Sequence, residues 1–380
     1  MNIKLTEEFF LDDNLIYFNH AAVGVWPKRT RDAVAAFADQ NMVRGAADYP
    51  EWMKTEAALR ERLKRLVNAA SCSDIALCKN TSEALSLIAY GLDWQPGDNV
   101  VSSNQEFPSN RIVWESLADR SVTLRLADLF CNDPEAALMA CCDENTRLLS
   151  VSSVQYGTGL RMDLNRLGKF CRENGILFCV DAIQSLGAIR FDVHACRADF
   201  VVADGHKWML GPEGIALFYS SPEARGKLKL LQYGWHMVER AGDFDAVDWK
   251  PATAARRFEP GSPNMVGIYA LNASLSLLED AGMAFVEAEL LSRSRQLIDW
   301  IRSRDELELI TPEAPDRHAG IVTFRVRSLD KEAHADLYRR LMVSGLICAH
   351  RAGGIRFSPH FYSDLSTFEA CWEMNTGTTR

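Results

Sequence analysis

The sequence predicts an α/β fold with a large domain, built on a mostly parallel central sheet flanked by helices, and a smaller C-terminal α/β domain. Three observations support this prediction. The chain has 380 residues, more than one ordinary hydrophobic core supports. Short apolar runs alternate with longer amphipathic runs from about residue 75 to 220. The short runs are continuously apolar, as in parallel strands buried on both faces.

The expected strands and helices of the large domain alternate along the chain. The strand-like runs are 75–78, 100–103, 147–154, 176–180 and 199–203. The helical runs between them are 83–90, 110–117 and 164–174. Ligands of such sheets bind outside the carboxyl ends of the strands. The segments that follow the strands are unusually polar for such short turns, and they are 79–82, 105–110, 155–156, 181–184 and 204–207.

The pattern of expected helices and strands in the remainder of the chain predicts the second domain. An irregular stretch rich in Trp, Tyr, Gly and charge, 222–263, reads as a surface excursion. Two helices, a strand, a third helix and two short strand-like runs follow, and they are 266–279, 285–302, 320–326, 334–344 and the surroundings of Leu346 and Ile355. We expect the large domain to be 16–260 and the small domain to be 1–15 with 261–380.

Composition excludes several classes of protein. The hydrophobic fraction of 47% and the charged fraction of 24% are those of a globular protein. A net charge of −9 argues against a nucleic-acid or anionic-membrane partner. The 10 cysteines are scattered, without a CxxC pair, which indicates reduced thiols and no metal site. The N-terminus lacks the pattern of a signal peptide, and no apolar run is long enough to span a bilayer, so we expect a cytoplasmic protein.

Lys207 is the first candidate for chemistry. It follows an apolar strand and precedes Trp208 and Met209, which would partly desolvate its amine. Desolvation lowers the pKa of a lysine and favours a nucleophilic amine that forms Schiff bases. The alternative is a turn lysine that points into water.

Asp181 ends another apolar strand and begins the segment Asp-Ala-Ile-Gln, which finishes at Gln184. A carboxylate at a buried strand end needs a cationic or donor partner. The protonated pyridine nitrogen of pyridoxal 5′-phosphate (PLP) is one such partner, and Gln184 then suits the phenolic oxygen of that ring. The alternative for Asp181 is a plain helix N-cap.

Three further segments contain residues that could bind the other groups of this cofactor and a substrate. The helix start at 80–83 predicts an anion site, although Asn80 and Glu83 also have the spacing of a capping box. Phe107 suits stacking on a ring, or a place in the core. Arg356, between apolar neighbours, suits a substrate carboxylate or a structural ion pair.

The joint order of these segments resembles the class V aminotransferase family of fold-type I PLP enzymes, which holds cysteine desulfurases, isopenicillin N epimerase-like proteins and kynureninase. The resemblance runs from Tyr17-Phe-Asn-His-Ala-Ala22 to the segment of Arg356. Its most specific motifs are Asp181-Ala-Ile-Gln184, Gly205-His-Lys207 and Arg257-Phe-Glu-Pro-Gly-Ser-Pro-Asn264.

The resemblance implies a PLP-dependent transferase or lyase of fold type I that acts on an amino acid. It makes Lys207 the Schiff-base residue, Asp181 the partner of the ring nitrogen and Gln184 that of the ring hydroxyl. It implies that the remaining residues hold the phosphate (Thr81, Ser82, His206), stack on the ring (Phe107) and bind the substrate α-carboxylate (Arg356).

The resemblance also implies a homodimer with shared active sites, because Ser262 would reach the phosphate of the neighbouring subunit. One departure from the family concerns the cysteine desulfurases, which carry a nucleophilic cysteine on a mobile loop shortly before the carboxylate arginine. Here Cys348 lies in a strand-like run, and buried cysteines are usually inert. The short turn before Arg356 is more similar to the epimerase-like branch.

The sequence leaves the reaction open among transamination, C–S lyase chemistry or desulfuration, and epimerisation, because these differ only in the groups around Cα. A binding module without catalysis would be expected to lack Lys207 or Asp181, and both are present. A Rossmann dehydrogenase predicts a Gly-x-Gly-x-x-Gly turn, which the chain does not contain.

Overall fold

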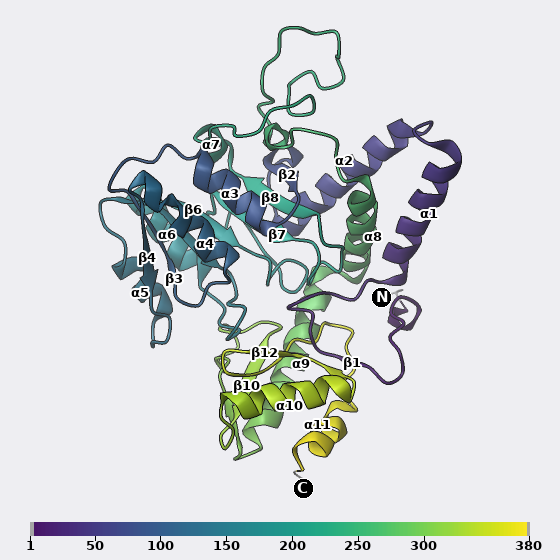
Figure 1. The fold of residues 1–380 in the computed structure, drawn as a ribbon, viewed down its shortest axis with the longest axis vertical. Coiled ribbons are helices and arrows are strands. Elements are labelled where there is room, and N and C mark those ends of the chain that lie inside the picture. Colours follow the sequence, from purple (N-terminus) through teal and green to yellow (C-terminus); the bar gives the residue numbers. More distant parts are fainter. Residues whose placement is uncertain (1–3, 378–380) are drawn as a thin grey trace.

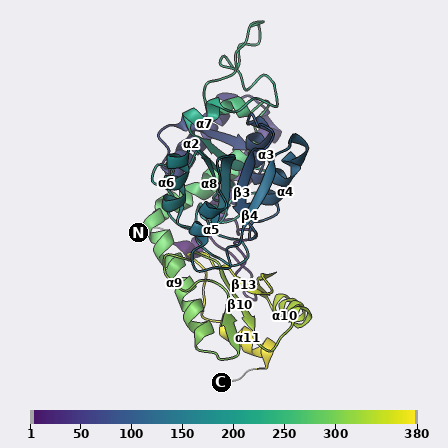
Figure 2. The ribbon, with the colours of Figure 1, turned by 90° about the vertical axis from the view of Figure 1, so that its left-hand side faces the viewer.

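The computed structural model describes residues 4–377, so residues 1–3 and 378–380 of the predicted small domain lie outside the described residues. Figure 1 shows a larger body above a smaller one, with the long helix α9 (Met283–Arg302) running from one into the other. The turned view of Figure 2 shows the same two bodies stacked along the long axis.

The larger body is built on a seven-stranded sheet in the order β2-β8-β7-β6-β5-β3-β4. Its strands are β2 Ile75–Cys78, β3 Asn99–Ser103, β4 Thr123–Ala127, β5 Thr146–Ser152, β6 Leu177–Asp181, β7 Phe200–Asp204 and β8 Ala216–Ser220. Neighbouring strands pair in parallel, except that β8 is antiparallel to both β7 and β2. The predicted mostly parallel central sheet is confirmed.

Helices cover both faces of this sheet. They are α1 Lys28–Arg44, α2 Tyr49–Val67, α3 Thr81–Gly91, α4 Ser109–Glu115, α5 Pro134–Ala140, α6 Leu164–Asn174, α7 Pro222–Gly226 and α8 Met265–Ala281. Side chains alternate between the two faces along each strand. In β7, Val201 packs in one core with residues of α2, α5, α6 and α8, whereas Phe200 and Val202 pack in the other with residues of α3 and α4.

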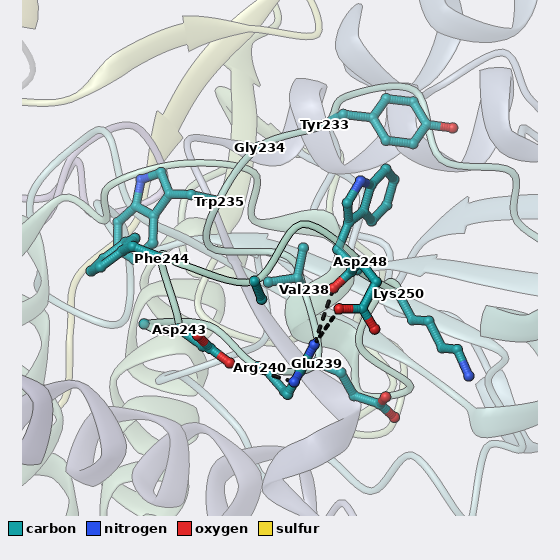
Figure 3. A pocket seen from close by; sticks show the side chains of 13 residues that line it. Tyr233, Gly234, Trp235, Val238, Glu239, Arg240, Asp243, Phe244, Asp248 and Lys250 are labelled. Carbon is teal, nitrogen blue, oxygen red and sulfur yellow. Dashed lines mark hydrogen bonds and ion pairs between the residues drawn. The ribbon is translucent and has the colours of Figure 1, made fainter.

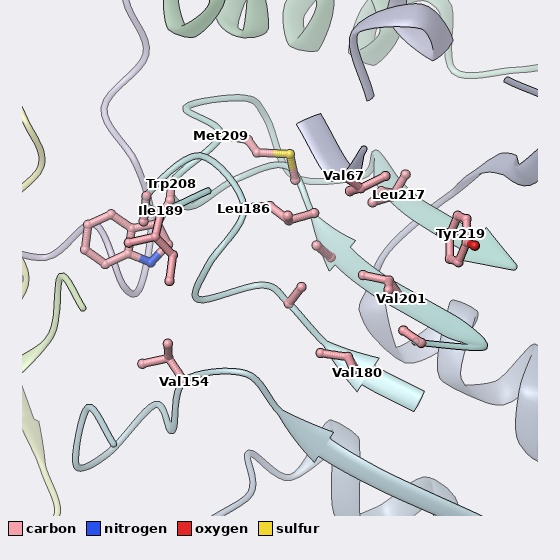
Figure 4. Packing of buried hydrophobic residues seen from close by; sticks show 14 of the residues in the cluster. Val67, Val154, Val180, Leu186, Ile189, Val201, Trp208, Met209, Leu217 and Tyr219 are labelled. Atoms are coloured by element: carbon pink, nitrogen blue, oxygen red, sulfur yellow. The ribbon is translucent and has the colours of Figure 1, made fainter. Parts of the chain in front are cut away.

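The first of these cores also receives the turn after β7. Figure 4 shows Val180 and Val201 from neighbouring strands beside Leu186, Trp208 and Met209. Trp208 and Met209 are fully buried, so the segment that carries Lys207 is held by the core on the side away from its amine.

The smaller body holds an antiparallel four-stranded sheet in the order β12-β13-β10-β9, and β1 pairs with β11 beside it. Its elements are β1 Ile16–Tyr17, β9 Leu307–Leu309, β10 Val322–Val326, α10 Lys331–Val343, β11 Leu346–Ile347, β12 Ala349–Arg351, β13 Gly354–Phe357 and α11 Phe368–Thr376. These elements and the second half of α9 enclose a third core.

The predicted boundaries between the domains stay predictions, and the packing favours different ones. Phe18 belongs to the core of the smaller body, although it lies within 16–260. Ile268 and Leu271 of α8 belong to a core of the larger body, although they lie beyond residue 260. These contacts favour a C-terminal boundary within α9.

The stretch 222–263, predicted to be irregular, contains the helix α7 and a 3-10 helix at Ala255–Phe258. Residues 227–254 between them form the irregular excursion, which Figure 1 shows as a loop projecting from the top of the larger body. Exposed aromatic side chains lie along it, at Tyr233, Trp235, Phe244 and Trp249. Within residues 4–377, no helix combines the length and the apolar character needed to cross a membrane.

Candidate functional site

A cavity of about 250 Å³ opens at the carboxyl ends of the parallel strands, where it meets the hairpin β12–β13 of the smaller body. It is lined by Ala21, Ala22, Asn80, Thr81, Ser82, Phe107, Ser109, Ser152, Tyr156, Asp181, Ile183, Gln184, Asp204, His206, Lys207, Arg351 and Arg356. The structure therefore brings together every predicted site residue except Ser262.

Lys207 lies three residues after the end of β7, and its side chain is largely buried. The chain packs tightly behind it, because a Cβ on Gly24 would lie 2.1 Å from the carbonyl oxygen of Lys207. Burial lowers the pKa of its amine, and the negative charge of Asp181 opposes this shift only in part. More of the Lys207 amine is thus neutral at neutral pH than in an exposed lysine.

Asp181 is the last residue of β6 and is buried at the same cavity. One of its carboxylate oxygens accepts the backbone N–H of Ile183 at 3.0 Å. Burial raises the pKa of Asp181, and nearby Glu106 raises it further, against the effects of the Ile183 N–H and of Lys207. A cation placed beside Asp181 would relieve the cost of its buried charge.

Glu106 is itself buried, and donors surround its carboxylate. They are the backbone N–H of Ser152 at 2.9 Å, the side-chain amide of Gln155 at 2.8 Å and that of Asn110 at 2.9 Å. This network stabilises a second negative charge below the cavity. Glu106 belongs to the polar segment 105–110 after a predicted strand, but its residue type and position in the sequence predict no role for it.

Gln184 is held in one orientation. Its amide nitrogen donates to the carbonyl oxygen of Ala21 at 3.1 Å, and its amide oxygen accepts the indole N–H of Trp208 at 2.8 Å. The amide nitrogen keeps a second N–H that is available to an acceptor in the cavity.

The start of α3 forms a polar wall of the cavity. Asn80 caps the helix by accepting the backbone N–H of Glu83 at 2.9 Å, and Thr81 accepts the backbone N–H of Asp204 at 3.1 Å. The hydroxyl of Ser82 donates to that of Ser109 at 2.8 Å. Free N–H groups at a helix start, with hydroxyls beside them, suit an anion such as a phosphate.

His206 completes this wall, with its Nδ1 3.0 Å from a carboxylate oxygen of Asp204.

Ser109 was not among the predicted site residues, although it lies in the polar segment after β3. Its neighbour Phe107 is 42% exposed, with its ring edge-on to Tyr156 and its centroid 5.7 Å from the amine of Lys207. Phe107 is therefore a cavity residue and not a core residue.

Arg356 enters from β13 and is buried, without a carboxylate partner among the described residues. Its two terminal nitrogens donate to the carbonyl oxygen of Tyr156 at 2.8 Å and to the side-chain oxygen of Asn19 at 3.3 Å. Its Nε has no hydrogen-bond partner within residues 4–377. Burial lowers the pKa of Arg356 to about 9, and the charge of Arg351 contributes. A negatively charged ligand would compensate this buried cation.

Two predicted residues lie elsewhere. Ser262 is exposed, just before α8, and does not line this cavity. Cys348 lies between β11 and β12 in the core of the smaller body, with its backbone N–H directed at the sulfur of Met342. Burial raises the pKa of the Cys348 thiol to about 12, so it stays a protonated thiol at neutral pH.

Comparison with known proteins identifies the family to which the chain is similar and the structures that share its fold. The family model described as aminotransferase class V matches residues 16–369. A probable cysteine desulfurase of Pyrococcus abyssi is 30% identical over 391 residues, covering 97% of this chain and 94% of that protein. One of Methanothermobacter thermautotrophicus is 31% identical over 321 residues, covering 80% of this chain and 78% of that protein.

Solved structures share the fold at low sequence identity. The cystine C–S lyase C-DES, in complex with its reaction product cysteine persulfide, superposes with a TM-score of 0.87 at 23% identity, covering 96% of this chain and 97% of that chain. The cysteine desulfurase CsdA from Escherichia coli gives a TM-score of 0.85 at 21% identity, covering 97% and 96% of the two chains.

Proposed function

The chain belongs to the class V aminotransferase family of PLP-dependent enzymes, and we propose that it cleaves the bond between Cβ and sulfur in a sulfur-containing amino acid. The predicted family, fold class and dependence on PLP are confirmed. The choice of reaction is the proposal. It is supported by relatives named cysteine desulfurases and by the position of Cys348.

The cavity offers a partner to each polar part of PLP. The phosphate fits the start of α3, between Thr81, Ser82 and His206. The ring nitrogen fits Asp181, whose raised pKa reflects a buried carboxylate without a full counter-charge. The ring hydroxyl fits the free N–H of Gln184. When bound, PLP accepts the negative charge that develops at Cα of the substrate.

Lys207 and Phe107 complete these assignments. The partly neutral amine of Lys207 suits the covalent bond to the cofactor aldehyde. Phe107 offers its ring to the cofactor face. With the cofactor and a substrate bound, the amine of Lys207 would be the group able to act as general base on the proton of Cα.

Arg356 anchors the substrate through its α-carboxylate. Arg356 is buried and has no acidic partner within residues 4–377, so the protein holds a cation ready for this group. Fixing the carboxylate limits the rotation of the substrate, which helps to align the Cα proton with Lys207.

The burial of Cys348 is the observation that carries the choice of reaction. A desulfurase moves the substrate sulfur onto a thiolate of its own, and Cys348 lies in the core of the smaller body instead. No cysteine lines the cavity in the described part of the chain. The sulfur therefore leaves with its bonding electrons while Lys207 takes the Cα proton. The remaining unsaturated amine reacts with one water, so that cysteine gives sulfide, pyruvate and ammonia.

Product analysis tests this proposal. We expect the purified enzyme with PLP to release sulfide and pyruvate in equal amounts from L-cysteine, and Cys348→Ala to do the same. Cys371→Ala, which alters another buried cysteine of the same core, is the matched control. Alanine in place of pyruvate, with loss of activity only in Cys348→Ala, would show a desulfurase. A keto acid formed only with an added amino acceptor would show a transaminase, and a D-amino acid product an epimerase.

We further propose a homodimer in which Ser262 contributes to the neighbouring active site. Ser262 is exposed and lies outside the cavity of its own chain, which leaves it available to a second subunit. We expect Ser262→Ala to remain dimeric in light scattering but to bind PLP more weakly. A monomeric wild-type protein with full PLP affinity would contradict this proposal. The cytoplasmic location stays a prediction.

A further inference from the structure

The hairpin β12–β13 delivers two arginines to the cavity. Arg351 pairs with Gly354, and Ala349 pairs with Arg356, so both arginines lie on the same face of the hairpin. The turn between them contains Ala352 and Gly353, both with positive φ, at 49° and 73°. Such a two-residue turn fixes the register of the hairpin and with it the relative position of the two guanidinium groups.

Arg351 has no acidic partner. Its one hydrogen bond runs from a terminal nitrogen to the carbonyl oxygen of His350 at 2.8 Å, and it forms no ion pair with any residue in the range 4–377. Many exposed arginines pair with carboxylates, as Arg325 does with Glu308 at 2.6 Å. Others, such as Arg197 and Arg295, form no ion pair within the described residues, but they do not line this cavity. Arg351 is an unpaired arginine that does line it.

The charge of Arg351 acts inside the cavity. It lowers the pKa of Arg356 and contributes to lowering that of Lys207, so all three cations face the same space. The acidic groups of the lining are Asp181 and Asp204, and both lie at the opposite, sheet side. The α-carboxylate of an amino acid substrate would pair with Arg356. A second anionic group would be needed to pair with Arg351.

We propose that Arg351 is a specificity-determining residue that binds an acidic group on the substrate side chain, so that the enzyme prefers amino acids with a short, negatively charged β-substituent. This inference rests on the proposed function, because it assumes that Arg356 holds the α-carboxylate. The cavity of about 250 Å³ has to hold both cofactor and substrate, which limits the side chain to a short one. Arg351 is exposed at the mouth, where the outer end of a side chain would lie.

L-Aspartate and L-asparagine are matched probes, since they differ in charge and hardly in shape. Their affinities for the PLP-loaded enzyme can be measured by the change in its visible absorbance. We expect L-aspartate to bind about fivefold more tightly than L-asparagine, a modest ratio because Arg351 is exposed. In Arg351→Gln this ratio falls to about one, and Arg351→Lys keeps part of it. Arg339→Gln removes an exposed charge on α10, away from the cavity, and keeps the wild-type ratio.

A turnover experiment extends the test to substrates. S-sulfo-L-cysteine carries a charged leaving group and, with one water, gives pyruvate, ammonia and thiosulfate. S-methyl-L-cysteine carries a neutral one and gives methanethiol. We expect the wild-type enzyme to favour S-sulfo-L-cysteine in kcat/KM about fivefold more than Arg351→Gln does.

The outcomes separate the two proposals. Equal binding of L-aspartate and L-asparagine, with sulfide and pyruvate still released from L-cysteine, would overturn the role of Arg351 alone. An unchanged aspartate preference in Arg351→Gln would do the same. If no amino acid altered the absorbance or formed a product, the proposed function would fail together with this inference.

Discussion

Two of the cavities in the described part of the chain contrast with each other. The larger, about 580 Å³, lies within the excursion, and all the residues that line it fall between 233 and 250. Figure 3 shows its walls, with Trp235 beside Phe244 and with Arg240 bonded to Asp248. The smaller cavity, about 250 Å³, is lined by segments far apart in the sequence, and its charged groups Asp181, Lys207 and Arg356 are buried.

This difference favours the smaller cavity as the candidate functional site, despite its lower volume. In the larger cavity the exposed side chain of Arg240 pairs with Asp243 and Asp248 of the same loop, at little energetic cost. The smaller cavity holds buried charges whose pKa values are shifted, and only the packing of the surrounding sheet and helices maintains them. Such unpaired buried charge is a more reliable sign of ligand binding than the size of a hollow.

The largest effect should come from removing the amine of the smaller cavity. We expect Lys207→Ala to lose the visible absorbance of bound PLP and to reduce activity by on the order of 10³-fold, because both the covalent bond and the general base disappear. Lys169→Ala, an exposed lysine on α6, should leave both unchanged. A yellow Lys207→Ala protein that bleaches with borohydride would show that another amine holds the cofactor.

Removing the buried guanidinium should have the next largest effect. We expect Arg356→Gln to lower kcat/KM by about 10²-fold, mainly through KM, because the α-carboxylate is bound alike before and during the reaction. Steady-state kinetics with L-cysteine measure this effect. Arg325→Gln on the neighbouring strand β10 is the control, and a lowered kcat with constant KM would assign Arg356 a role other than binding.

Asp181 should link stability of the PLP-free protein to pH. Its pKa in the folded state is raised above the unfolded value, so its contribution to stability is present at low pH and is lost as pH rises through the folded pKa. We expect Asp181→Asn to raise the free energy of unfolding of the PLP-free protein by about 1 kcal/mol at pH 8 and by less at pH 5. We expect the same substitution to lower the activity of the PLP-loaded enzyme. Thermal unfolding of both proteins at both pH values measures the difference. A gain that is larger at pH 5 would contradict the burial argument.

The smallest effect should come from the larger cavity. We expect Arg240→Gln to change the free energy of unfolding by less than about 0.5 kcal/mol, because its partners Asp243 and Asp248 are exposed. Denaturant unfolding tests this expectation. A loss of several kcal/mol would mean that the excursion is structurally coupled to the rest of the molecule, and the contrast between the cavities would disappear.

Much of the sheet was predictable because its buried strands are apolar throughout. The strand Ile75–Cys78 and the helix Leu164–Asn174 have the expected limits, and the polar segments after the strands do line the cavity. Strand β8, Ala216–Ser220, was missed although it is buried throughout. Strand β4 was missed because Thr123 to Ala127 mixes polar and apolar residues at the edge of the sheet. Its one neighbour in the sheet leaves it half-exposed, so it lacks a continuous apolar run.

The site was predicted where local sequence determines it. Asp181 ends one buried strand and Lys207 follows another, and because the carboxyl ends of parallel strands share one edge of the sheet, the closeness of the two residues could be inferred. Their roles came from the family resemblance. Arg351 could not be found this way, since its position depends on the turn at Ala352 and Gly353 and on how the smaller body faces the larger one. The proposed role of Ser262 concerns a second subunit, and packing within one chain leaves it a prediction.

Helix α9 has a consequence for how catalysis is aligned. Val286 and Leu290 near its start are packed in one core, Leu297 and Ile301 near its end in the other, and its 20 residues span about 30 Å. The arginines that would grip the substrate belong to the body packed on the end of α9, and the lysine that would react belongs to the body packed on its start, although all three side chains meet in one cavity. Any tilt of the rod would carry both arginines together, preserving their grip while changing the reach of the lysine. The stiffness of this helix, together with the N-terminal segment that packs on both bodies, thus contributes to how accurately a gripped molecule would be presented for reaction.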